Sequence, residues 1–104
     1  MAKETYQEKL ERYYDSEHKL TQYPSKRPLR ILALERIASQ IEENREYTEK
    51  EVNEIIRDNI TFTDQEWIRR ELFQYKFMGR FKDGSKYWLD EDWKTIVKRY
   101  ITEE

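Results

Sequence analysis

Two side chains that stand one helical turn apart, Arg70 and Gln74, are the best suited to recognise another molecule. Arginine pairs with the guanine edge and glutamine with the adenine edge in the DNA major groove. If residues 64–76 form a helix with Ile68 at the centre of its buried face, the 100° step per residue exposes both side chains. The spacing therefore favours DNA binding through this helix.

Other kinds of chemistry find less support in the residue types. The chain has one histidine, His18, and no cysteine, so no Ser/His/Asp or Cys/His arrangement can be built. Glu11, Asp15 and His18 have the spacing of a weak metal site on one helix, although a solubilising polar face is the other interpretation. We expect no enzyme activity, no cofactor, no bound metal and no small-molecule substrate.

The net charge of the chain is only −2, but acidic and basic residues are segregated along it. Residues 19–36 and 76–88 are basic, whereas residues 42–54 hold six glutamates against two cations. If the two basic segments share a face, that face can meet phosphates. The residues expected to contact DNA are Arg69, Arg70, Gln74, Arg80, Lys82, Lys86, Lys26 and Arg27. Arg69 has an alternative role, pairing with an acid of residues 42–54.

A second function class is suggested by the same helix. Asp64 and Glu66 stand at its N-terminal end, where carboxylates repel phosphate, although they could equally act as partners of the helix dipole. Trp67 and Phe73 are expected toward the outside, and exposed rings are typical of protein interfaces. The alternative to DNA binding is therefore a protein-interaction or assembly module that uses Trp67 and Phe73.

The elements that position these residues are mostly helices. We expect a helix over 3–17 and a second from Ser25 to about Ile41, with Pro28 in its first turn. Capping boxes at Thr48–Glu51 and Thr63–Glu66 predict the starts of two more. A last helix, capped by Asp90, carries an apolar stripe that comprises Trp93, Ile96, Val97, Tyr100 and Ile101.

A β-hairpin is predicted between the last two helices. Gly79 has the position of a left-handed residue at a helix end. Asp83-Gly84 favours a type I′ turn between strands at 80–82 and 85–89. Three helices followed at once by a hairpin are the layout of a winged-helix domain, and the first and last helices are additions that cover the core or form a homodimer.

The length of 104 residues predicts one domain, 1–104, whose core contains many aromatic rings, since these make up 14% of the chain. We expect a winged-helix core over 19–89, an N-terminal helical extension over 1–18 and a C-terminal helix over 90–104. The lack of cysteines and of long apolar runs predicts a cytoplasmic protein with no membrane contact.

Five short segments also resemble a known bacterial family in order and spacing. They are Lys19 to Arg27, Tyr47-Thr48-Glu49 with Glu51-Val52-Asn53, Arg69-Arg70-Glu71-Leu72, Gly79-Arg80, and Asp83-Gly84-Ser85 with Tyr87-Trp88. Over residues 19–89 the chain resembles domain of unknown function 2087, whose members stand alone or beside helix-turn-helix modules in transcriptional regulators. The resemblance implies a winged-helix-like fold and a regulatory setting, but no biochemical activity. Phe73-Gln74 departs from the Val-Asp pair of the family.

Overall fold

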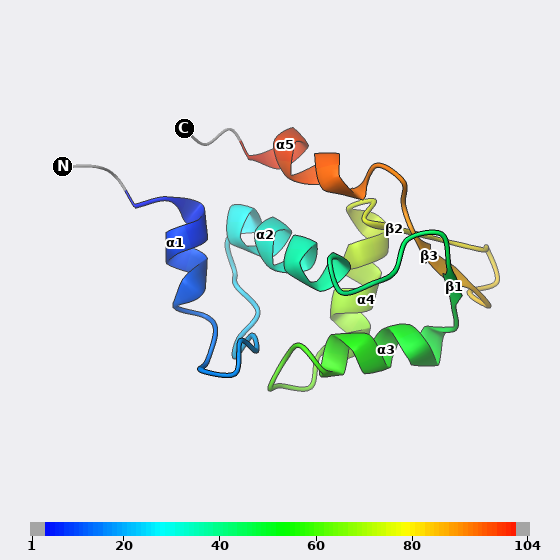
Figure 1. Ribbon diagram of the computed structural model, residues 1–104, viewed down its shortest axis with the longest axis horizontal. Coiled ribbons are helices and arrows are strands. Elements are labelled where there is room, and N and C mark those ends of the chain that lie inside the picture. The colour runs from blue at the N-terminus through cyan, green and yellow to red at the C-terminus, as the bar shows by residue number, and fades with distance from the viewer. Residues whose placement is uncertain (1–3, 102–104) are drawn as a thin grey trace.

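The computed structural model describes residues 4–101, which form mostly helices and one small sheet (Figure 1). The helices are α1 (Tyr6–Glu11), α2 (Arg27–Ala38), α3 (Glu49–Arg57), α4 (Gln65–Gln74), the 3-10 helix η1 (Trp93–Thr95) and α5 (Ile96–Tyr100). The strands are β1 (Glu46–Tyr47), β2 (Met78–Arg80) and β3 (Tyr87–Leu89). None of the helices in this part of the chain is long and apolar enough to cross a membrane.

The sheet is antiparallel, with the strand order β1-β3-β2. The predicted hairpin is present as β2 and β3, in which Arg80 is the partner of Tyr87 and Gly79 that of Trp88. Its strands are not those predicted: β2 begins two residues before the expected strand at 80–82, and β3 is shorter than the expected strand at 85–89. The strand β1 was not predicted, because two residues are too few to show an alternating pattern. Its pairing of Tyr47 with Tyr87 joins the start of α3 to the hairpin.

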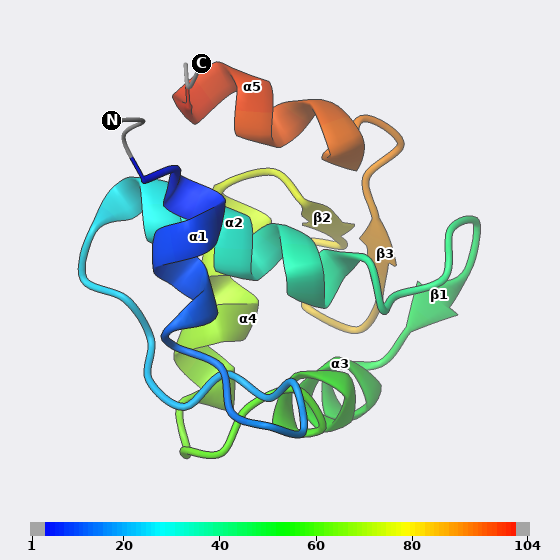
Figure 2. The same ribbon diagram turned by 60° about the vertical axis from the view of Figure 1, so that its left-hand side comes forward.

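The core surrounds α2, which packs against α1, α4, η1 and α5 (Figures 1 and 2). The apolar residues of α2, from Leu29 to Ala38, are all buried. Leu10 of α1 and Ile96 of α5 are also almost fully buried, and Trp93 is 9% exposed. The additional helices at the two ends of the chain thus cover the core, one of the two arrangements expected. Residues 1–3 and 102–104 of these predicted helices lie outside the described residues.

One predicted capping box is confirmed and the other is wrong. At α3 the Thr48 hydroxyl accepts the Glu51 N–H at 3.1 Å, and the Thr48 N–H donates to the Glu51 carboxylate at 2.8 Å. At α4 the N-cap is Asp64 rather than Thr63, and its side chain forms no capping hydrogen bond. The sequence pattern therefore predicted the start of α4 to within one residue but not the hydrogen bonds at its N-cap.

The first predicted helix is too long. α1 ends at Glu11, and the Asp15 carboxylate accepts the N–H groups of Glu17 and Lys19 in a turn. His18 then has the left-handed φ of 63°. Glu11, Asp15 and His18 consequently do not share a helix face, and residues 4–101 contain no cluster of side chains that could hold a metal ion. The second helix begins after Lys26 and ends at Ala38, shorter than predicted.

The turn predictions around the hairpin also need correction. The left-handed residue after α4 is Lys76, with φ of 73°, whereas Gly79 lies within β2. Gly79 is needed because an added Cβ would lie 2.5 Å from Nε1 of Trp88. Gly84 has a positive φ but Asp83 does not, so the turn is not type I′. Instead the Phe81 carbonyl accepts the Gly84 N–H at 2.9 Å.

The C-terminal segment begins with a tighter helix than predicted. The Asp90 carboxylate accepts the Asp92 N–H at 2.8 Å, and η1 then leads directly into α5. This shape directs Trp93 into the core, where its indole N–H donates to the Glu43 carboxylate at 3.1 Å.

Candidate nucleic-acid interface

An open groove of about 520 Å³ lies between α4 and the hairpin. α4 lines it with four side chains, and α3, the turn after α4 and the hairpin supply the rest: Arg69, Arg70, Phe73 and Gln74, then Glu49, Lys76, Arg80 and Tyr87. The sequence prediction placed Arg70, Gln74 and Arg80 on one surface, and the structure brings these three side chains to this groove.

Arg80 is held beside α4 by an aromatic ring. Its guanidinium carbon lies 4.6 Å from the centroid of the Phe73 ring, a cation–π contact. Cross-strand partners share a face of a sheet, so Arg80 lies on the same side as Tyr87, which also lines the groove. Phe73 is 39% exposed and acts as a support for this cation.

Arg69 does not belong to the exposed surface. It is only 8% exposed, and its guanidinium donates to the Asn53 side-chain oxygen at 2.6 Å and lies 3.3 Å from a Glu49 oxygen. Both partners are on α3, so Arg69 joins α4 to α3. This is the alternative role predicted from the acidic segment 42–54, although Arg69 also lines the groove.

Several cations near the groove have no direct polar partner. Within residues 4–101, the side chains of Arg70, Lys76, Lys82 and Lys86 form no hydrogen bond or ion pair, and the Arg80 guanidinium lies over the Phe73 ring. The pKa of Glu51 is lowered chiefly by the hydrogen bond from the Thr48 N–H, and the charge of Lys86 contributes to this shift. The nearest acid in the hairpin loop is Asp83. Its carboxylate accepts the Ser85 N–H at 2.9 Å, which lowers the pKa of Asp83. Asp83 is therefore ionised, and residues 65–89 still hold six basic side chains against three acidic ones.

Lys26 and Arg27 are not part of this surface. They lie at the start of α2, left of the middle in Figure 1, whereas the hairpin loop is at the right-hand end, and neither residue lines the α4 groove. Lys26 lines a separate groove beside α1, and the Arg27 guanidinium carbon is 5.9 Å from the centroid of the Tyr100 ring. The two basic segments of the sequence thus do not join at the α4 groove.

Trp67 packs with Tyr23 and Arg30 beside the buried Glu71. Its ring, 44% exposed, meets Tyr23 edge-on with centroids 5.5 Å apart, and the Arg30 guanidinium carbon lies 5.1 Å from each ring. The Tyr23 hydroxyl donates to the buried Glu71 carboxylate at 2.8 Å. Trp67 and Phe73, predicted together as a partner surface, therefore have separate neighbours within the chain.

Sequence reasoning missed two features of this site. Lys76 lines the groove, but the sequence analysis included it only in the basic segment 76–88 and did not predict it as a contact residue. Glu71 was not singled out, although it stands three residues after Ile68 and hence on the buried face of α4. A charged residue at a buried helix position indicates a partner, which here is the Tyr23 hydroxyl.

The family model described as "Uncharacterized protein conserved in bacteria (DUF2087)" matches residues 19–89. No curated protein and no solved structure matches the chain.

Proposed function

The chain belongs to the DUF2087 family, and we propose that it is a winged-helix protein that binds duplex DNA in bacterial transcription regulation. In this proposal α4 is the recognition helix, and the β2–β3 hairpin is the wing. Arg70 and Gln74 face base edges, while Lys76, Arg80, Lys82 and Lys86 contact the DNA backbone.

The order of elements supports the winged-helix assignment. α2, β1, α3 and α4 follow one another, and the hairpin comes directly after α4. The strand β1 lies between the first two core helices in sequence and pairs with the second hairpin strand, which gives the order β1-β3-β2. In this arrangement the exposed face of α4 and the hairpin loop are free to approach one ligand.

The observation that carries the proposal is the groove in which Arg70 and Gln74 meet Lys76 and Arg80. Cations that have no partner in the chain gain most from phosphate contacts, because binding neutralises them and releases counterions from DNA. The Phe73 ring orders the Arg80 guanidinium before any ligand arrives, which lowers the entropy cost of a contact.

A fluorescence-anisotropy titration against a labelled duplex of random sequence tests the proposal without knowledge of an operator. Four neutralised phosphates, one for each cation assigned to the backbone, give a slope of log affinity against log salt of about −3 to −4. Lys82→Gln should reduce the slope by about one for every sequence, whereas Arg70→Ala should cost roughly 1–3 kcal/mol at a preferred site. The matched control is Lys98→Gln, which removes an exposed cation from α5 and should change neither.

Absence of binding at micromolar protein and about 50 mM salt would contradict DNA recognition. The protein-interaction alternative would then be favoured by the exposed rings of Phe73 and Phe81, which are 39% and 47% exposed. Phe81 stands at the hairpin loop and contacts Trp88 edge-on with centroids 5.3 Å apart. Exposed rings of this kind are enriched in protein interfaces.

A further inference from the structure

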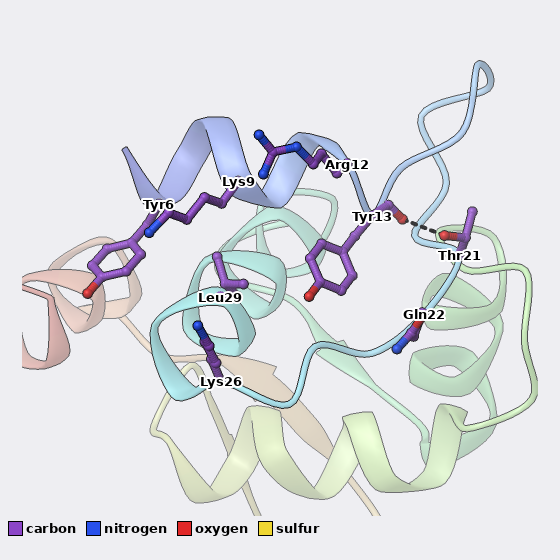
Figure 3. A pocket seen from close by; sticks show the side chains of 8 residues that line it. All are labelled: Tyr6, Lys9, Arg12, Tyr13, Thr21, Gln22, Lys26 and Leu29. Atoms are coloured by element: carbon purple, nitrogen blue, oxygen red, sulfur yellow. Dashed lines mark hydrogen bonds between the residues drawn. The ribbon is translucent and has the colours of Figure 1, made fainter. Parts of the chain in front are cut away.

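A second groove, of about 570 Å³, lies between α1 and the segment that leads into α2 (Figure 3). Tyr6, Lys9 and Tyr13 line it from the α1 side, and Gln22, Lys26 and Leu29 line it from the other. This volume is within the range of sites that hold small molecules. It is distinct from the α4 groove, because no residue lines both.

The groove is positively charged. Its lining residues include Lys9, Arg12 and Lys26 but no carboxylate. Arg12 forms an ion pair with Glu4, and Lys9 lies 5.2 Å from the centroid of the Tyr6 ring. Lys26 forms no side-chain hydrogen bond or ion pair with any residue of 4–101. Charge therefore remains available for an anion, chiefly at Lys26 and Lys9.

The start of α2 adds to this potential. Lys26 is its N-cap and supplies no capping oxygen, so the N–H groups of Arg27 and Leu29 have no capping side chain, while Pro28 between them has no N–H. The positive end of the helix dipole adds to the charge of the Lys26 side chain. The three sources, two lysines and the helix end, favour the same sign of ligand.

Part of the groove wall is aromatic or aliphatic. Figure 3 shows the Tyr13 ring and Leu29 pointing into the space between α1 and α2, with the Gln22 amide at one end. The Tyr13 carbonyl accepts both the N–H of Thr21, at 2.7 Å, and its hydroxyl, at 2.8 Å, which fixes the segment opposite the ring. A flat ring inserted here would lie against Tyr13 and Leu29.

We propose that this groove binds a small organic anion that carries a flat ring, with the anionic group at Lys9 and Lys26 and the ring against Tyr13 and Leu29. A nucleoside monophosphate and an aromatic carboxylate both have this chemistry. The groove does not depend on the α4 site, so this proposal can be tested independently of DNA binding.

The test follows the amide NMR spectrum of the labelled full chain during titration with adenosine monophosphate and, separately, with benzoate. Saturable shifts confined to α1 and residues 21–30, reached at roughly millimolar ligand, are the expected result with at least one of them. The ligand that binds identifies the anionic group. If adenosine monophosphate binds, adenosine alone and inorganic phosphate alone should each bind at least tenfold more weakly than it does. If benzoate binds, benzyl alcohol and acetate should each bind at least tenfold more weakly than benzoate.

The matched variants are Lys26→Gln and Lys98→Gln, which each remove one exposed cation. The first should weaken ligand binding by about tenfold, as expected for one lost charge-assisted hydrogen bond, and the second should leave it unchanged. Lys26→Gln should also leave the affinity for duplex DNA unchanged. No saturable shift with either ring anion, equal weakening by both variants, or equal binding of the uncharged or ringless compounds overturns the proposal.

Discussion

Replacing Tyr23 by phenylalanine tests the contact that fixes α4 against the rest of the molecule. The Tyr23 hydroxyl donates to Oε1 of the buried Glu71 at 2.8 Å, and Nη1 of Arg30 lies 3.7 Å from the same oxygen. The variant Tyr23→Phe keeps the ring that meets Trp67 and removes only the hydroxyl. Any loss of stability therefore reports on the hydrogen bond rather than on packing.

The magnitude follows from the charge of the acceptor. A hydrogen bond to a charged group contributes about 1.5–3 kcal/mol, and because Arg30 still faces Glu71 in the variant, we expect the lower half of this range. For a chain of this size the melting temperature should fall by roughly 6–15 °C. Urea unfolding followed by circular dichroism measures the free energy directly.

The control is Tyr13→Phe, since the Tyr13 hydroxyl has no hydrogen bond to the described residues. It should change the free energy of unfolding by less than about 0.5 kcal/mol. If the two variants are equally stable, then the hydroxyl of Tyr23 does not stabilise the carboxylate and the reasoning fails.

The same contact predicts a dependence on alkaline pH. Burial raises the pKa of Tyr23 above its ordinary value near 10, and the hydrogen bond to the Glu71 carboxylate raises it further. Because the folded pKa is raised, the contribution of Tyr23 is fully present below pH 10 and is lost as the pH rises above the unfolded pKa. The free energy of unfolding should fall by at most about 1.4 kcal/mol per pH unit through this group, and Tyr23→Phe should lack this part of the pH dependence. Identical slopes for the two proteins between pH 10 and 11 would contradict the assignment.

Two further predictions concern the elements around the α4 groove. Thr48→Ala should destabilise the protein by about 1 kcal/mol through loss of the N-cap acceptor of α3, whereas Thr63→Ala should be nearly neutral, because Thr63 is not the N-cap residue of α4. Equal effects in urea unfolding would show that both boxes form. Gly79→Ala should lower the melting temperature, because its Cβ would lie 2.5 Å from Nε1 of Trp88, and Trp88→Leu in the same chain should restore part of the loss. A neutral Gly79→Ala would show that the Trp88 ring moves aside freely.

Local signals in the sequence predicted most of the helices. A capping box has two interactions that depend only on residues three apart, so Thr48 and Glu51 could be recognised without knowledge of the fold. The same pattern failed at Thr63 and Glu66, where the chain enters α4 one residue later and the backbone of Asp64 takes the N-cap position. The residue types permit a box at either place, and only the path of the preceding loop decides between them.

Features that depend on distant partners could not be predicted in the same way. Gly79 was assigned to a helix end from its local position, but its real constraint is the Trp88 ring on the neighbouring strand. β1 exists because residue 47 meets Tyr87, which is 40 residues later in the chain. The predicted helix over residues 3–17 ended early because Asp15 offers its carboxylate to the backbone of a turn.

The candidate site shows why residue type and helical spacing predicted only part of the interface. The 100° step separated the exposed Arg70 and Gln74 correctly from the buried Ile68, since this geometry is a property of the helix alone. It could not decide the role of Arg69, which lies at the edge of the buried face and becomes buried because α3 offers it both an amide oxygen and a carboxylate. A flanking arginine can turn toward solvent or toward an acidic neighbour, and burial of its charge is favourable only when that neighbour is present. The acids of residues 42–54 therefore determine how many cations α4 leaves for a ligand.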